Sequence, residues 1–294
     1  MSFETPQSPA PASKSSAKTG WIVFGILAVA LGLRLPDYSE SIWIDELYTS
    51  NIFCGDPVIL LKTLYSDIHP PFYFVFIHFW NQLFGDAEIW IRLPSLLCGL
   101  GTIVLVWRLG QLFVGRSAGL VAAGLLATSP VHIWYSQEAR PYSATLFLTL
   151  ATILSYYRVS QGRGIVWTFL FVVSLVCLSF THYYNATFPC LLLLLTFFRD
   201  SPNRRRLLAV ILWVLAALGL YMVTKIYFSS VPVRASYLRA FDHGEVWDLF
   251  FGWFLTGDVL ELARMSSPLA DIFSIVVKGL ALLAFLRARG IVAT

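Results

Sequence analysis

Residues 71–84, PFYFVFIHFWNQLF, decide how this chain crosses a membrane. The stretch is apolar, but a helix of this length rises only about 21 Å at ~1.5 Å per residue, and spanning the hydrocarbon takes ~30 Å. His78, Asn81 and Gln82 follow one another at helical spacing and form a polar stripe. We therefore predict that this segment is a helix lying in the membrane interface and that it does not span.

The composition places the whole chain in the membrane class. Of its 294 residues 57% are hydrophobic and only 13% are charged, and the mean hydropathy is +0.70. A soluble domain of this size needs more charge to cover its surface. The four cysteines show no pairing pattern, and three of them lie in apolar runs, so neither a disulfide framework nor a cysteine metal site is indicated.

Eight other apolar runs are long enough to be considered as spans. They cover residues 21–35, 92–113, 118–136, 142–158, 165–181, 186–198, 207–228 and 270–287. The first is interpreted as an uncleaved span, because Arg34-Leu35-Pro36 follows it where a signal peptide would have a small-residue cleavage site.

The distribution of charge supports this layout and fixes its orientation. With residues 71–84 outside the bilayer, twelve of the 21 basic residues and only two of the 17 acids fall on one side of the membrane. The positive-inside rule makes that side cytoplasmic. We predict an all-α, polytopic transmembrane helical bundle of about eight spans, with interfacial helices in the first outer loop and both termini cytoplasmic.

This layout divides the chain into three parts. Residues 1–20 are predicted to be a disordered cytoplasmic tail, 21–287 the transmembrane domain, and 288–294 a cytoplasmic end. Two long outer segments, 36–91 and 229–269, belong to the transmembrane domain, and such connections usually carry function. No internal repeat is visible, which disfavours a transporter.

Candidate site residues gather on the predicted outer side. Asp45 and Glu46 lie in an otherwise apolar segment, where carboxylates are costly unless solvated, paired or functional. His69 stands on a rigid Pro70-Pro71 elbow, as a plain surface histidine or as a phosphate or hydroxyl contact. Five histidines lie on or near the outer half, but none has convincing metal-ligand spacing.

A second group follows the run 118–136. Glu138 and Arg140 flank one alanine before Pro141, so they either form a local ion pair or leave the arginine fork to grip a phosphate. Arg34 and Arg92, near the outer boundary, could share that role or extend to lipid headgroups. His182 and its neighbouring tyrosines are interpreted as interfacial anchors.

These motifs resemble those of a known family. The chain is similar to polytopic GT-C glycosyltransferases that use lipid-linked sugars, in the branch shared by protein O-mannosyltransferases and the lipid A aminoarabinose transferase. The resemblance covers most of residues 21–200. Its markers are Asp45-Glu46, His69-Pro70-Pro71, Arg92-Leu93-Pro94-Ser95 and the run Ser136–Tyr142. Relatives commonly have more spans and often a soluble C-terminal domain, which leaves truncation at residue 294 an open alternative.

The resemblance implies roles for these residues. Asp45 and Glu46 are the catalytic candidates, with Asp45 matching the acidic residue that acts on the acceptor and Glu46 as a positioning group. Arg140 matches the arginine that meets the donor phosphate. His69, Glu138, Tyr142 and Arg92 complete the predicted substrate-binding set.

The predicted activity is inverting transfer of a sugar from a polyprenyl-phosphate donor to a lipid, glycan or protein acceptor on the non-cytoplasmic side. The acceptor hydroxyl needs a base, and the departing phosphate needs a cation. No residue pattern indicates a cofactor site, so no cofactor is predicted, and a divalent metal remains an alternative without supporting ligand spacing. No nucleic-acid partner is expected. The expected location is the bacterial inner or plasma membrane, with the active face periplasmic or extracellular. A lipid or sugar transporter or flippase is the alternative function.

Overall fold

The computed structural model describes residues 14–36 and 70–228, together with residues 38, 46, 47, 49, 50, 60 and 64. In this part of the chain every regular element is helical, which confirms the predicted all-α class. The principal helices are α1 (Lys14–Gly32), α4 (Phe72–Phe84), α5 (Glu88–Phe113), α6 (Arg116–Ala127), α7 (Pro130–Gln137), α8 (Pro141–Ser160), α9 (Ile165–Ser179), η2 (Tyr183–Ala186), α10 (Thr187–Phe198) and α11 (Arg204–Phe228).

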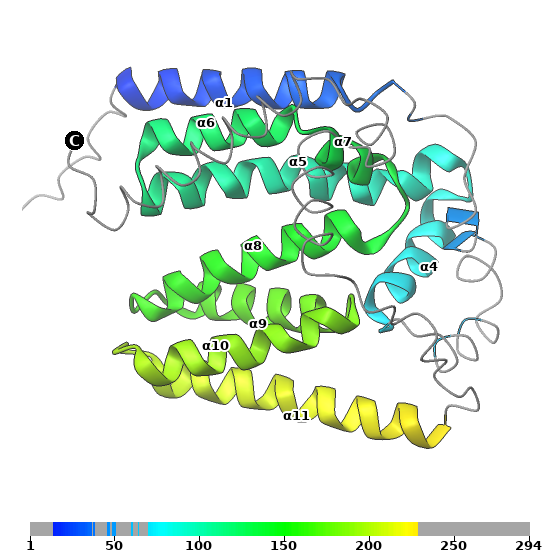
Figure 1. The fold of residues 1–294 in the computed structure, drawn as a ribbon, viewed down its shortest axis with the longest axis vertical. Coiled ribbons are helices and arrows are strands. Elements are labelled where there is room, and N and C mark those ends of the chain that lie inside the picture. Colours follow the sequence, from blue (N-terminus) through cyan, green and yellow to red (C-terminus); the bar gives the residue numbers. More distant parts are fainter. Residues whose placement is uncertain are drawn as a thin grey trace, which may run out of the picture.

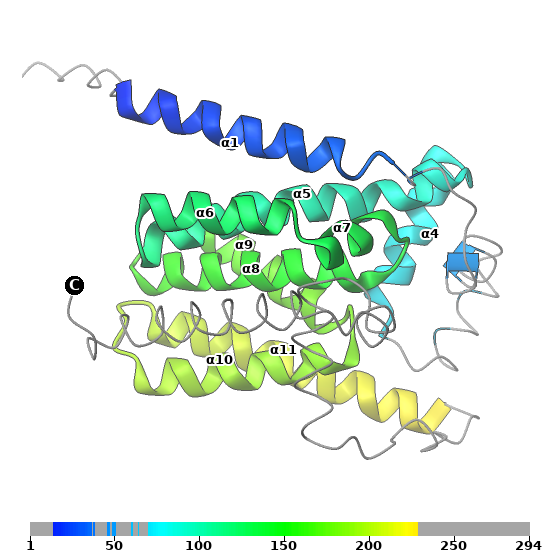
Figure 2. The ribbon, with the colours of Figure 1, turned by 45° about the horizontal axis from the view of Figure 1, so that its top comes forward.

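The long helices lie side by side and form one bundle (Figures 1 and 2). Helix α1 packs on α6, α5 packs between α6 and α8, and α8 continues the series to α9, α10 and α11. Short α4 lies across one end of this bundle and contacts α5 (Figure 1). The α7–α8 turn is at the same end as α4, whereas the α8–α9 and α10–α11 connections are at the opposite end.

The lengths of the helices agree in part with the predicted spans. By length and composition, two described helices can cross a membrane, Glu88–Phe113 and Arg204–Thr224, and the bent pair α6 and α7 would make a third. Three shorter apolar helices overlap other predicted spans: Lys18–Gly32, Ile165–Ser179 and Tyr183–Phe198. The predicted span 270–287 and the outer segment 229–269 lie outside the described residues.

The run 118–136, predicted as a single span, is broken in the structure. Helix α6 ends at Ala127, α7 begins at Pro130, and the two axes differ by 61°. Pro130 explains the break, because proline has no N–H to donate and its ring collides with a preceding helical turn. Helix α7 then packs against α5 at Gly99, where a Cβ would lie 2.2 Å from Ser136 Oγ.

Helix α4 confirms that residues 71–84 are helical. Tyr73, Phe74 and Ile77 are buried on its inner face, and Phe79 and Leu83 are exposed. The predicted polar stripe is not uniform, since His78 belongs to the buried face while Gln82 is exposed. One face of α4 therefore packs on the bundle, and the opposite face exposes apolar side chains, as a helix in contact with lipid does.

The backbones of α5 and α6 touch at two glycines. A Cβ on Gly119 would lie 2.6 Å from the Trp107 carbonyl oxygen and 2.7 Å from the Gln111 nitrogen, and one on Gly110 would lie 2.6 Å from the Gly119 Cα. Real Cβ atoms cannot approach backbone so closely. The hairpin therefore requires glycine at this crossing.

We predict that Gly119→Ala destabilises the protein, because the methyl group would force α5 and α6 apart at a cost of about 1–3 kcal/mol. Gly124→Ala is the matched control in the same helix, since nothing lies within 4 Å of a Cβ there. That control should be neutral or stabilising by up to about 1 kcal/mol from helix propensity. Thermal unfolding of the purified protein in detergent measures both variants, and equal melting temperatures would contradict the close contact.

Candidate functional site

The turn between α7 and α8 carries the centre of the site. Glu138 and Arg140 have extended backbones, and the Arg140 N–H donates to the Glu138 carbonyl oxygen at 2.9 Å. Pro141 occupies the first turn of α8, where its fixed φ favours the start of a helix and its missing N–H loses no bond. This turn presents the backbone N–H of Ala139 and the side chains of its two neighbours to the end of the bundle.

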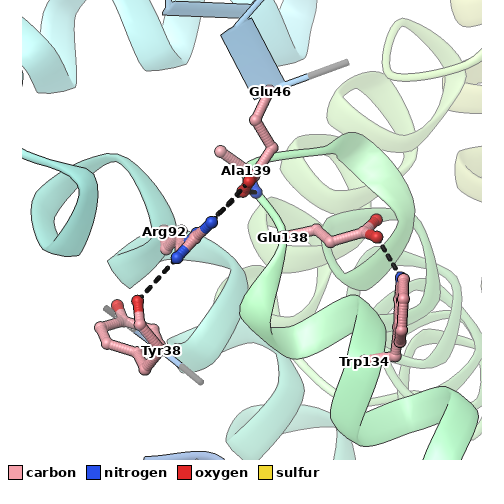
Figure 3. A network of polar contacts seen from close by, with 6 residues as sticks. All are labelled: Tyr38, Glu46, Arg92, Trp134, Glu138 and Ala139. Carbon is pink, nitrogen blue, oxygen red and sulfur yellow. Dashed lines mark hydrogen bonds and ion pairs between the residues drawn. The ribbon is translucent and has the colours of Figure 1, made fainter. Parts of the chain in front are cut away.

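A buried carboxylate connects this turn to two distant segments (Figure 3). Glu46 Oε1 accepts hydrogen bonds from the Ala139 N–H at 2.7 Å and from Arg92 Nε at 2.9 Å, and Glu46 Oε2 lies 2.6 Å from Arg92 Nη2. Arg92 Nη1 donates to the Tyr38 carbonyl oxygen at 2.8 Å. Glu46 is 1% exposed and Arg92 is 4% exposed. The first outer segment, the start of α5 and the α7–α8 turn are therefore joined at one point.

Tyr38 adds a second contact between the first outer segment and α5. Its hydroxyl donates to the Ile89 carbonyl oxygen at 2.9 Å. Burial raises the pKa of Tyr38 to about 12, against the opposing effect of the Arg92 cation, so the hydroxyl remains a donor at neutral pH. Residue 38 is thus bound to the α5 end through both its carbonyl and its side chain.

A second polar cluster fixes the bent helix pair. The Arg34 guanidinium is fully buried and donates to the carbonyl oxygens of Ala30 at 2.7 Å and Ala127 at 3.1 Å. Both oxygens lie in the last turns of their helices, so two helix dipoles stabilise this cation. Arg34 Nη2 also lies 2.6 Å from His132 Nδ1, and Gln137 Nε2 donates to the Arg34 and Pro36 carbonyl oxygens at 3.1 and 2.6 Å.

Glu138 does not pair with Arg140. Its carboxylate accepts a hydrogen bond from the Trp134 indole N–H, on the side of the turn away from Glu46 (Figure 3). The local ion pair considered from the sequence is therefore absent from the described residues. Trp134, one helical turn before Glu138, provides the partner that the sequence pattern did not reveal.

Arg140 is the unusual member of the site. It is 7% exposed, its Nε has no hydrogen-bond partner, and no carboxylate of a described residue contacts its guanidinium. It also occupies the cap position at the start of α8, where the helix dipole repels a cation. A buried cation in such a place is costly unless an anion joins it.

A second unsatisfied donor lies in the same region. Tyr73 is 2% exposed, and its hydroxyl lies near Ser95 without reaching hydrogen-bonding geometry, so it has no hydrogen-bond partner among the described residues. Ser95 in turn lies against the turn, because its Oγ is 3.4 Å from the Arg140 carbonyl oxygen. Burial raises the pKa of Tyr73 well above its usual range, so the group stays protonated. Tyr73 and Arg140 thus provide two buried donors for which the described part of the chain offers no acceptor.

The structure brings together four of the seven predicted site residues, namely Glu46, Arg92, Glu138 and Arg140. Tyr142 follows in the first turn of α8, is 37% exposed, and its ring centroid lies 4.6 Å from that of Tyr135. Asp45 and His69 lie outside the described residues. Among the residues that are described, no three His, Cys, Asp or Glu side chains are grouped as metal ligands would be.

Fold and site together define an all-helical integral membrane protein with a buried ionic network at one end of its bundle. A sequence profile of the dolichyl-phosphate-mannose-protein mannosyltransferases matches residues 68–229, which is more than half of the chain. The chain belongs to this family.

A solved structure with the same fold is similar to this chain. It is the Saccharomyces cerevisiae protein O-mannosyltransferase Pmt1-Pmt2 complex bound to the sugar donor, with a TM-score of 0.58 and 17% sequence identity. The similarity covers 72% of this chain and 34% of that one, so this chain spans about a third of the length of its structural relative. No curated protein sequence matches the chain at a significant level.

We predict that Glu46→Ala and Arg92→Ala each destabilise the protein by about 3–5 kcal/mol, since each leaves an unpaired buried charge. The double variant should lose clearly less than the sum of the two, which a double-mutant cycle in thermal or denaturant unfolding measures. Asp86→Ala, at an exposed acid in the α4–α5 connection, is the control and should change stability by no more than about 0.5 kcal/mol. Additive effects of the two site variants would show that the pair is not coupled.

Proposed function

We propose that this protein is a membrane glycosyltransferase that moves a sugar from a polyprenyl-phosphate donor to a hydroxyl of its acceptor, with inversion at the anomeric carbon. The site at the α4 end of the bundle is the proposed reaction centre. Eight spans, with both termini on the cytoplasmic side, would place this end on the non-cytoplasmic face. The family name favours a mannosyl donor carried on a lipid phosphate, and the yeast complex of the same fold is bound to its sugar donor.

The observation that carries this proposal is the buried Arg140, which has no counter-ion among the described residues. Its charge, the start of α8 and the Tyr73 hydroxyl all favour an anion in this region, and the Arg140 cation acts electrostatically on Tyr73. A lipid phosphate is an anion with oxygens that can accept from a guanidinium fork and a phenol together. We assign Arg140 and Tyr73 to the phosphate of the donor.

Asp45 is the proposed general base. It is the sequence neighbour of Glu46, whose carboxylate is held by the Ala139 N–H one residue before Arg140. The three bonds of Glu46 occupy its carboxylate, which favours a positioning role for this residue and leaves the base function to Asp45. Arg92 is likewise proposed to position Glu46, because its Nε and both Nη atoms already bind protein groups.

The proposed step is a single displacement. The acceptor oxygen forms a bond to the anomeric carbon while the bond from that carbon to the phosphate oxygen breaks. The acceptor proton passes to the Asp45 carboxylate, and the electron pair of the broken bond stays on the lipid phosphate. Arg140 and Tyr73 stabilise the charge that develops on this leaving group, which is where a preorganised cation contributes most. We propose that the other parts of the donor and the acceptor are contacted by Tyr142, His69 and Glu138.

We predict that Asp45→Asn abolishes transfer of radiolabelled sugar from a polyprenyl-phosphate donor in membranes, because the amide cannot take the acceptor proton. The loss should be at least about 100-fold, as is typical for removal of a general base. Asp86→Asn, at an exposed acid of the α4–α5 connection, is the matched control and should retain activity. Full activity of Asp45→Asn would refute the assignment. Movement of labelled lipid across the bilayer without transfer would support a flippase instead.

We predict opposite effects on stability and donor binding for Arg140→Met. Removing a buried cation that no described residue pairs with should raise stability by about 1–3 kcal/mol, while affinity for the donor phosphate should fall about tenfold or more. Tyr73→Phe should also keep or raise stability and weaken donor binding by about tenfold. The measurements are apparent melting temperatures without and with a non-hydrolysable donor analogue.

Arg108→Met is the matched control, since this arginine is exposed at the far end of α5. It should leave the donor-induced stabilisation unchanged. If Arg140→Met lowered stability and kept the response to the donor analogue, Arg140 would be a structural residue and the phosphate site would lie elsewhere.

A further inference from the structure

The end of the bundle opposite the proposed reaction centre carries a cluster of arginines. They come from the α8–α9 and α10–α11 connections and the helix ends beside them, and we call them the arginine surface: Arg158, Arg163, Arg199, Arg204, Arg205 and Arg206. None of them takes part in the chemistry proposed above. Their separation from that site, at the other end of α8, makes any role they have independent of it (Figure 1).

The two connections are joined into one surface. Ser201 Oγ donates to the Ser160 carbonyl oxygen at 2.9 Å, and Asn203 Nδ2 donates to the Val159 carbonyl oxygen at 3.0 Å. Gly162 adopts a φ of +81°, and a Cβ there would meet Pro202 at 3.5 Å. The arginines of both connections are therefore held in a common frame.

Several of the guanidinium groups are held against aromatic rings. Arg158 lies 5.5 Å from the Trp167 ring centroid, and Arg199 lies 5.7 Å from that of Tyr157. Arg204 lies over Phe197 and also donates to its carbonyl oxygen at 2.8 Å. Stacking leaves the edge of a guanidinium available for bidentate contact with an anion.

Within the described residues, no nearby acid balances the positive charge of this surface. Asp200 is the one acid in the two connections, and among the described residues it pairs with none of the six arginines. If these residues only set the orientation of the protein in the membrane, positive charge would be enough, and lysine provides it as well. Every basic residue of this cluster is arginine, the residue whose planar fork matches phosphate oxygens.

The surroundings of the arginine surface are apolar and exposed. Ile165 and Val166 at the start of α9 are 74% and 66% exposed, and Phe197 and Phe198 at the end of α10 are 62% and 79% exposed. A soluble phosphate would use the arginines alone, whereas a lipid also covers such side chains with its acyl chains. We propose that the arginine surface binds the phosphate headgroups of anionic phospholipids, seated where these helices leave the hydrocarbon.

The test uses the full chain in neutral detergent and measures binding of phosphatidylglycerol and phosphatidylcholine by native mass spectrometry and by the shift in melting temperature. The protein should bind phosphatidylglycerol at least about tenfold more tightly. Arg163→Gln with Arg205→Gln should lower that affinity about 25-fold, at about fivefold for each basic residue removed. Both side chains are exposed, so the variant should fold normally.

A control variant and two further measurements make the outcome decisive. Lys18→Gln with Arg108→Gln removes the same charge at the same end from exposed positions outside the cluster, and should change the affinity less than twofold. Arg163→Lys with Arg205→Lys keeps the charge but loses the planar forks, and should weaken binding severalfold. Equal affinity for the two lipids, or an equal loss in the control, would overturn the proposal. Displacement of phosphatidylglycerol by millimolar inorganic phosphate, with the same thermal stabilisation, would reassign the surface to a soluble anion.

Discussion

The Glu46 carboxylate is the contact on which the arrangement of the site depends. It accepts from Arg92 at the start of α5 and from the Ala139 N–H between α7 and α8, although 46 and 93 residues separate it from these partners. In a membrane protein the bundle can form by helix packing alone, but helix packing does not specify where a long outer segment lies. A buried ion pair with an additional backbone hydrogen bond does so, because each alternative position would leave a charge unpaired away from water.

The same constraint explains a division of labour within the acidic pair. The Glu46 carboxylate accepts hydrogen bonds on both of its oxygens and fixes the segment, and for this reason the proposed function gives the base role to its sequence neighbour Asp45. The turn at residues 138–140 shows a comparable division. Glu138 is bound to Trp134, the backbone of Ala139 holds Glu46, and Arg140 alone has no partner for its charge among the described residues. In the proposed function, stability and ligand binding would thus rest on different residues of one short turn.

Much of this organisation could be predicted from the sequence, for physical reasons. Apolar runs and the arginine distribution indicate a helical membrane protein, because both follow from the solvent that surrounds the chain. The short run 71–84 was correctly predicted as a helix, and the turn at Glu138–Pro141 was located by its proline. The motifs also indicated the family that the profile match confirms.

Other features depended on tertiary contacts that no local pattern reveals. The 61° bend at residues 128–129 could have been suspected from Pro130, but the hydropathy of the run 118–136 does not mark it. Arg92 was expected to meet lipid or substrate, and only the fold shows its partner to be Glu46. Tyr73 was hidden within an apolar run, where its burial in the same region as Arg140 depends on how α4 crosses the bundle.

The buried Arg34 has a consequence for the order in which the chain assembles. Its guanidinium sits at the end of the first helix, and two of its partners, Ala127 and His132, are synthesised almost a hundred residues later. A buried arginine is costly in an apolar surrounding until it is paired. Helix α1 must therefore stay near the water interface, or beside the insertion machinery, until α6 and α7 emerge. The bend that shapes the site thus also sets the moment at which the first helix can take its final depth.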